Sequence, residues 1–378
     1  MSLRFGRALM VALTVLAVVV GTALGAASGR TASVPQFLAP TIQFNQQGVS
    51  GDVAARALNA LAAQQRANRS AAGMTNVHFI LNWLPNVEFA GLWMAQKFGW
   101  WKQAGINMTF KGWAPGVTPE TDVPAYSGTA FGFQSGAAIG IARSRGVPIT
   151  ALYTDTQKSV FGLTVTAKSG ITSLKQLRGK KVGYQSHEFY VPATMLSCVG
   201  LRQTDWVPRQ VGFDTSQLTS GAVDAYLTFV TNEPIALKLQ GVSTRTFAAA
   251  NYCFHFYDDV LFATNSLIAK NPSLVKTVVG IVARGFRWAH THPTMAARYT
   301  VSHTFPAGKG TSAALNLKQQ ILELQAFGPF SVDSRGQFSG LMSTAYWQDS
   351  INTLYKYKEI NSKPSAAAIY TNRFNPYK

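Results

Sequence analysis

The sequence is poor in charged residues, which make up 13% of its 378 positions. Acidic residues are the scarcer kind: 16 Asp and Glu stand against 34 Lys and Arg, for a formal net charge of +18. The basic residues are scattered, without the basic runs and interleaved aromatics typical of nucleic-acid-binding proteins. We therefore expect no nucleic-acid partner. Such a balance can attract anionic lipid, cell-wall polymer or an anionic solute, but a basic protein of the cell envelope is the simpler interpretation.

Common catalytic and metal-binding motifs are also absent. The sequence contains no GxSxG, GxxxxGK[ST] or GxGxxG motif and no CxxC or HxxxH spacing. His187, His255 and the pair His290 and His292 invite an acid–base or metal interpretation, but residues two apart lie on different faces of a helix. We interpret these histidines as structural and predict a protein that is not an enzyme and holds no cofactor or metal.

Residues 1–30 have the pattern of a secretory signal. Arg4 and Arg7 precede an apolar run from Ala8 to Val20, and small residues follow. The run is short for a membrane span, which needs about 20 residues. We expect an exported protein, periplasmic or extracellular and associated with the cell envelope; an uncleaved N-terminal anchor is the alternative. Residues 31–74 have a different composition and are predicted to be an accessory spacer or helix.

The chain has only two cysteines, Cys198 and Cys253, which lie 55 positions apart. In an exported chain such a pair is consistent with a disulfide. Both cysteines lie in apolar surroundings, MLSCVGL and NYCFHFY, which fit two buried free thiols nearly as well. The sequence leaves both interpretations open.

From about Thr75 the chain alternates between strand-like and helix-like patterns, which indicates an α/β fold with mainly parallel sheets. A late block, Pro272 to Tyr357, is chiefly helical and is expected to complete an earlier domain. The predicted strands are Val77–Leu81, Asn107–Phe110, Ala130–Phe133, Ile149–Tyr153, Leu163–Ala167, Lys181–Tyr184, Arg209–Val211 and Ala225–Phe229. The predicted helices between them are Ala90–Phe98, Ser135–Ser144, Ser173–Leu177, Val191–Val199, Thr215–Ser220 and Glu233–Leu239.

One stretch, FILNWLPNVEFAGLWMAQKFGWWKQAG, combines a strand, a polar turn and a Trp-rich helix. Ligands of open α/β sheets bind beyond the carboxyl ends of the strands. The turn residues Trp83, Asn86 and Glu88 therefore lie where recognition is expected.

Four segments of the sequence resemble solute-binding proteins of ABC importers, in the group that binds thiamine pyrimidine precursors, nitrate, sulfonate and taurine. They cover about residues 75–270 in the family's order. The pattern PNVEFAG is the most specific and points toward the pyrimidine-precursor branch. The segments are FILNWLPNVEFAGLWMAQKFGWWKQAGINM, GTAFGFQSGAAIGIARSRGVPITALYTDTQKSVFGLTV, SGITSLKQLRGKKVGYQS and DAYLTFVTNEPIALKLQG.

This resemblance implies a type II periplasmic-binding-protein fold: two α/β lobes joined by two crossovers, with the ligand in the cleft between them. Lobe 1 would comprise residues 75–160 plus 262–378, and lobe 2 residues 161–261. The implied partners are a small-molecule ligand and an ABC permease and ATPase, with the membrane surface approached through the permease. Closure about a hinge is the expected motion.

In lobe 1, the resemblance and the strand ends select four ligand-binding candidates. Trp83 can stack on a flat heteroaromatic ring, or be a core residue. Asn86 can donate and accept hydrogen bonds at once, or be the polar residue of the turn. Gln134 and Ser135 lie between a strand and a helix, where the helix N-terminus can face the ligand.

In lobe 2, three residues are the matching candidates. His187 and Tyr190 follow a predicted strand, although they can also be loop residues only. Glu233 can accept from an exocyclic amine, or cap the helix that Pro234 begins.

The sequence also departs from the resembling family in ways that bear on function. Phe89 stands where the pyrimidine synthases of the same fold have a His, and their Cys-rich iron-binding motif is absent, which disfavours an enzyme. No convergent pair of Arg or Lys can be identified, which weakens nitrate, sulfonate and taurine as ligands. The expected ligand is a small heteroaromatic solute such as a thiamine pyrimidine precursor, although riboflavin fits Trp83 equally well.

Overall fold

The computed structural model describes residues 73–185, 188–304 and 316–378, all within one compact unit. The predictions for residues 1–30, for nearly all of 31–74 and for His187 lie outside these ranges. Among the helices in the described part of the chain, none is long and apolar enough to cross a bilayer.

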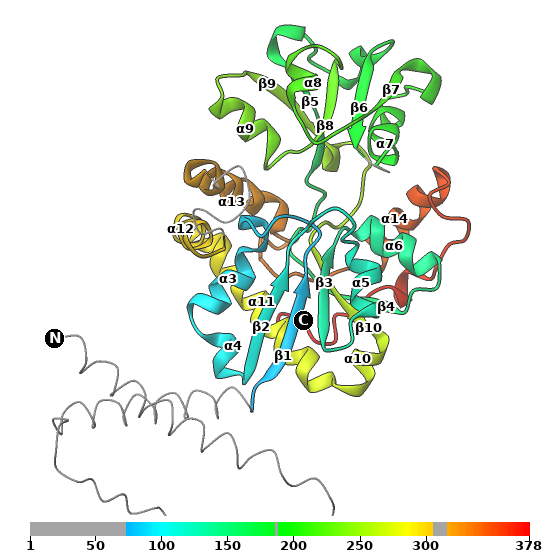
Figure 1. Cartoon of the computed structure of the whole chain (residues 1–378). Helices are drawn as coiled ribbons and strands as arrows, with labels where there is room; N and C mark the ends of the chain where they lie inside the picture. Colours follow the sequence, from blue (N-terminus) through cyan, green and yellow to red (C-terminus); the bar gives the residue numbers. More distant parts are fainter. Residues whose placement is uncertain (1–72, 186–187, 305–315) are drawn as a thin grey trace, which may run out of the picture. The chain divides into compact units, whose positions relative to one another are not determined.

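The described residues form a two-lobed type II periplasmic-binding-protein fold with two five-stranded sheets (Figure 1). The first sheet has the order β2-β1-β3-β10-β4, in which β1 pairs in parallel with β2 and β3, and β10 runs antiparallel to β3 and β4. Its strands are β1 (Thr75–Ile80), β2 (Ile106–Lys111), β3 (Ala130–Gln134), β4 (Ile149–Thr154) and β10 (Val260–Thr264).

The second sheet repeats this arrangement in the order β7-β6-β8-β5-β9. Strand β6 is parallel to β7 and β8, whereas β5 is antiparallel to β8 and β9. Its strands are β5 (Phe161–Thr166), β6 (Lys181–Gln185), β7 (Val207–Val211), β8 (Ala225–Phe229) and β9 (Thr244–Ala248).

The prediction of mainly parallel sheets is confirmed, since four of the five strands in each sheet run in the same direction, and one strand of each sheet, β10 or β5, runs the other way. β5 is the first strand after the chain leaves the first sheet, and β10 is the first after it returns. Each enters from the other lobe and therefore runs against its neighbours. Strands β9 and β10 were also missing from the predicted set, while the eight predicted strands all form, with ends shifted by at most a few residues.

Helices cover both sheets, and the predicted late helical block forms α11 to α14 (Figure 1). Helix α11 packs so closely on α3 that a Cβ on Gly285 would overlap the carbonyl oxygen of Gly91. Only glycine fits at this position of α11. The α-helices are α3 (Ala90–Lys97), α4 (Trp100–Gln103), α5 (Pro119–Ala125), α6 (Gly136–Ser144), α7 (Tyr190–Cys198), α8 (Ser216–Thr219), α9 (Glu233–Leu239), α10 (Asn265–Lys270), α11 (Pro272–Thr291), α12 (Pro293–His303), α13 (Leu317–Ser331) and α14 (Thr344–Lys356). The 3₁₀ turns are η1 (Val87–Phe89), η2 (Ala167–Ser169), η3 (Leu174–Leu177), η4 (Gln203–Asp205), η5 (Ala249–Asn251) and η6 (Ala366–Ala368).

The two segments that connect the sheets are held together by Asp258. Its buried carboxylate accepts from the Ser159 hydroxyl at 2.9 Å and from the Val160 backbone N–H at 3.0 Å. Its backbone N–H donates to the Thr156 hydroxyl at 2.9 Å. Residues 155–160 lead out of the first sheet and residues 249–259 lead back, so Asp258 joins the outgoing segment to the returning one.

The structure closes a disulfide between Cys198, the last residue of α7, and Cys253 in the returning segment. Of the two interpretations that the sequence left open, the disulfide is therefore confirmed. The bond ties a helix of the second lobe to the connection between the lobes.

Replacing Cys198 with Ser should lower the free energy of unfolding by about 2–4 kcal/mol, because a cross-link across 55 residues restricts the unfolded chain. Urea unfolding followed by circular dichroism measures this loss. The double variant Cys198→Ser, Cys253→Ser is the control, since its midpoint should not respond to a reductant. A wild-type midpoint that a reductant leaves unchanged would contradict the prediction.

Candidate functional site

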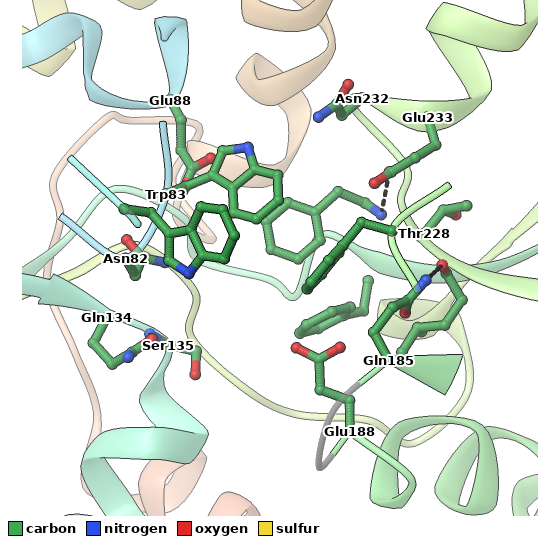
Figure 2. Close-up of a pocket in the computed structure, with 15 residues that line it drawn as sticks. Asn82, Trp83, Glu88, Gln134, Ser135, Gln185, Glu188, Thr228, Asn232 and Glu233 are labelled. Carbon is green, nitrogen blue, oxygen red and sulfur yellow. Dashed lines mark hydrogen bonds between the residues drawn. The ribbon is translucent and has the colours of Figure 1, made fainter. Parts of the chain in front are cut away.

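A pocket opens where the carboxyl ends of strands from both sheets meet, as the carboxyl-end rule predicts (Figure 2). Both lobes contribute to it. Its lining comprises Asn82, Trp83, Glu88, Trp113, Gln134, Ser135, Phe161, Gln185, Glu188, Phe213, Leu227, Thr228, Phe229, Asn232 and Glu233.

Three aromatic side chains gather on this pocket. The ring centroid of Trp83 lies 5.5 Å from that of Trp113 and 5.4 Å from that of Phe213. The Trp113 backbone N–H donates to the Trp83 carbonyl at 2.9 Å, which fixes the two loops of lobe 1 together. Phe213 comes from the other lobe and is 51% exposed. This aromatic trio, Trp83, Trp113 and Phe213, presents flat apolar faces from both lobes.

Sequence reasoning found Trp83 but missed Trp113 and Phe213. A signal for them exists: strand β2 is followed by Gly112-Trp113, and strand β7 by Gly212-Phe213. Strands β2 and β7 hold the same outer position in their sheets. The same dipeptide pattern, a Gly and an aromatic residue, thus follows equivalent strands in both lobes.

Three glutamates line the pocket, from three different elements. Glu88 in η1 is 4% exposed, and its Oε1 has no hydrogen-bond partner among the described residues. Burial raises the pKa of Glu88 to about 7, and burial also raises the pKa of the neighbouring Asp259. Glu188 is half-buried just before α7, and desolvation followed by repulsion from Asp258 and Glu233 raises its pKa to about 8. These groups keep protons that exposed carboxyls would have lost at neutral pH.

Glu233 is the third glutamate and the first residue of α9. Its Oε2 accepts from the Phe229 backbone N–H at 2.8 Å, a contact drawn as a dashed line in Figure 2. Burial raises its pKa to about 7. The carboxylate therefore lines the pocket and fastens the turn between β8 and α9, whereas the N-cap of α9 is Asn232 and no side-chain capping bond forms.

The other predicted site residues are divided between the pocket and the interior. Gln134 and Ser135 line the pocket, although the Gln134 amide is already engaged: its Nε2 donates to Glu120 at 2.8 Å and its Oε1 accepts from the Ser135 N–H at 2.8 Å. Ser135 caps α6 through Ala138.

Asn86 and Tyr190 do not line this pocket. The Asn86 side chain accepts from the Glu88 N–H at 3.0 Å, which is the turn role given above as its alternative. Tyr190 is buried against Phe254 and Phe256.

Three of the histidines considered for catalysis, His255, His290 and His292, do not line this pocket. His290 is buried against Asp155 with a nitrogen–oxygen distance of 2.8 Å, and His255 pairs with Asp349 on the surface at 3.0 Å. No group of His, Cys, Asp and Glu within the described ranges could hold a metal ion.

The charge of the site is opposite to that of the whole chain. The described pocket lining contains three glutamates and no Lys, Arg or His. Across residues 73–185, 188–304 and 316–378, no Lys or Arg is buried, whereas five carboxyls are: Glu88, Asp155, Asp258, Asp259 and Glu323. The basic surplus of +18 is therefore carried outside the core, and the pocket offers acceptors to a ligand that donates.

Comparison with known proteins assigns the chain to a family. The sequence profile of a family described as NMT1/THI5 like matches residues 86–296, more than half of the chain. The chain belongs to this family. A relative in Chloroflexus aurantiacus, the riboflavin-binding protein RibY, is 27% identical over 257 residues, covering 66% of this chain and 72% of RibY.

The NMT1/THI5-like relatives also include an enzyme. A 4-amino-5-hydroxymethyl-2-methylpyrimidine phosphate synthase of Legionella pneumophila is 22% identical over 228 residues, covering 59% of this chain and 72% of the synthase. Among solved structures, the periplasmic aliphatic sulphonate binding protein SsuA of Escherichia coli has the same fold, with a TM-score of 0.60, 14% identity and coverage of 79% of this chain and 91% of SsuA.

Proposed function

We propose that this chain is the extracytoplasmic solute-binding component of an ABC importer and takes a small heteroaromatic solute into the interlobe pocket. The observation that carries the proposal is the aromatic trio, in which two lobes face one pocket with flat rings. Thiamine pyrimidine precursors and riboflavin are the leading ligands, and the resemblance to riboflavin-binding RibY favours including the latter.

Binding rather than synthesis is favoured by the position of Phe89. It takes the place of the His of the synthases, is fully buried, and packs edge-on against Phe133 at 5.5 Å. It therefore does not line the pocket, so the histidine of the synthases has no histidine counterpart at this position. A pyrimidine synthase remains the second candidate because such an enzyme is among the relatives.

We include in this proposal that the chain is exported and that it works with an ABC permease and ATPase. The signal-like N-terminus and the fold shared with a periplasmic binding protein support an exported chain that delivers its solute to a permease and ATPase. The lobes, residues 75–160 plus 262–378 and residues 161–261, would close on the solute about the paired connecting segments. A thermal-shift screen with thiamine pyrimidine precursors, riboflavin, taurine and nitrate tests the function. We expect one heteroaromatic compound to raise the melting temperature. If no compound raises it, the proposed function is contradicted.

Replacing Trp83 with Ala should weaken binding of the stabilising heteroaromatic by about tenfold or more. The loss of one stacked ring removes about 0.5–1.5 kcal/mol in addition to its buried area, and 1.4 kcal/mol is a factor of ten. Isothermal titration calorimetry measures the change.

Trp100→Ala is the matched control for this experiment. Trp100 stacks on Phe98 and lies under the Arg284 guanidinium, outside the pocket. Equal affinities of the Trp83→Ala variant and the wild type would contradict the proposed stacking role.

A further inference from the structure

The pocket contains acceptors that the protein leaves unsatisfied. Glu88 Oε1 and Asn82 Oδ1 are both buried and have no hydrogen-bond partner among the described residues, and both residues line the pocket. A buried acceptor without a donor is costly unless a ligand or water supplies one. These two acceptors therefore favour a ligand that donates hydrogen bonds to them.

The three lining glutamates surround the space beside the aromatic trio. Figure 2 shows the carboxylate of Glu188 directed toward the middle of the pocket, with Glu88 on the side of Trp83 and Glu233 on the opposite lobe. An aromatic face attracts a cation, and the attraction is stronger when the site is desolvated. Carboxylates and ring faces together are the complement of a flat positive charge.

Resting on the solute-binding function above, we propose that the pocket selects nitrogen heterocycles that carry a positive charge and rejects their anionic derivatives. Glu188 and Glu233 pair with the positive charge of the ligand. Glu88 accepts a hydrogen bond from it, and the aromatic trio stacks on its ring. Phosphorylated and sulfonated solutes are excluded, because the described lining has no cation to pair with them and its carboxylates repel them.

The charged groups around these glutamates reinforce the same preference. Asp259, Asp258, Glu233 and Asp155 act on Glu88, and Asp258 and Glu233 act on Glu188. Glu323 approaches from α13, where Gln319 and Gln320 donate to it at 2.7 Å each. Gln319 also donates to Asn232 of the pocket at 3.2 Å. All of these groups are carboxyls, and a bound cation gains from those that are ionised. The basic groups nearby are His290, which faces Asp155 at 2.8 Å, and Arg145, which lines the adjoining hollow together with Glu188.

Binding of a cation should also release protons. The glutamates hold protons near neutral pH, and a cation favours their ionised form. Affinity for a cationic solute is therefore expected to rise between pH 5.5 and pH 8, while affinity for an uncharged analogue stays level.

Three related probes separate charge from shape: thiamine, a thiazolium cation; thiochrome, its uncharged fused-ring oxidation product; and thiamine monophosphate. Titration calorimetry with the full chain at pH 8 should give a dissociation constant for thiamine at least tenfold lower than for either of the others. Repeating the thiamine titration at pH 5.5 should weaken binding several-fold.

Glu188→Gln and Glu233→Gln remove a charge with little change in shape. Each should lower the affinity for thiamine by about tenfold and leave that for thiochrome within twofold. Asp349→Asn, which alters a carboxylate that is 56% exposed, is the matched control and should change neither.

The outcomes distinguish the charge preference of the pocket from the solute-binding function on which it rests. If thiochrome or thiamine monophosphate binds as tightly as thiamine, the charge preference is wrong while solute binding stands. The charge preference is equally wrong if the two Glu→Gln variants bind thiamine like the wild type. If no heteroaromatic probe binds, riboflavin included, both the inference and the proposed function are overturned.

Discussion

Raising the pH from 5 to 8 is expected to lower the melting temperature of the unliganded protein by roughly 10 °C. Burial raises the pKa of Glu88 and of Asp258 to about 7 and that of Glu323 to about 8. In the unfolded chain these groups titrate near 4. The folded state thus retains protons that the unfolded state has released, and its stability is full below pH 4 and falls as the pH rises through 7 and 8.

The size of this effect follows from linkage. Each pKa unit corresponds to about 1.4 kcal/mol, so several such groups sum to several kcal/mol, and 1 kcal/mol shifts the melting temperature of a chain of more than 300 residues by about 1–2 °C. Differential scanning calorimetry at pH 5, 6, 7 and 8 measures it.

Glu323→Gln is the informative variant for this prediction. It keeps the shape and an acceptor for the amides of Gln319 and Gln320 but removes the proton that titrates, so it should flatten the decline between pH 6 and pH 8. Asp349→Asn, on the surface, should leave the decline unchanged. A melting temperature that stays constant or rises from pH 5 to pH 8 would show that these carboxyls are not held protonated.

Replacing Asp258 with Ala should reduce the free energy of unfolding by about 2–4 kcal/mol. The change removes Asp258 Oδ2, the one buried acceptor of both the Ser159 hydroxyl and the Val160 N–H. Unsatisfied buried donors cost about 1–3 kcal/mol each. Urea unfolding at pH 6 measures the loss.

Two further variants make the Asp258 result specific. Asp258→Asn keeps one acceptor and should lose only part of the stability. Ser159→Ala removes a single hydrogen bond and should cost about 1 kcal/mol. If Asp258→Ala unfolds at the wild-type midpoint, the two connecting segments are not held together through this carboxylate.

The sequence predicted the elements of the fold better than their directions. Hydrophobic runs and polar breaks located eight strands, because burial on a sheet leaves a local pattern. The direction of β5 and β10 depends on which sheet each strand joins, and that is decided by contacts between segments about 100 positions apart. No local pattern carries this information.

The candidate site was predictable where a strand end identified it. Trp83, Gln134, Ser135 and Glu233 all line the pocket, since each ends or follows a strand of the parallel part of its sheet. Asn86 fits the same rule yet turns inward, because a capping hydrogen bond to the next residues competes successfully with a ligand.

The acidity of the pocket could not be predicted from the sequence, because the net charge is a sum over the whole chain and does not say where each charge lies. A chain with twice as many basic as acidic residues suggests an anionic partner, yet the buried carboxyls Glu88, Asp258 and Asp259 meet in the core. Glu88 is distant in sequence from the adjacent pair Asp258 and Asp259, and only the fold brings it to them.

The position of β10 between β3 and β4 has a consequence for the order in which the chain is made. Strands β3 and β4 are not bonded to each other, so the first sheet remains in two pieces until the ribosome has supplied residue 264. The second sheet, residues 161–248, is contiguous and is finished earlier. The first sheet is therefore begun first during synthesis but completed last. The side of the pocket that the second sheet supports can form before the side that the first sheet supports.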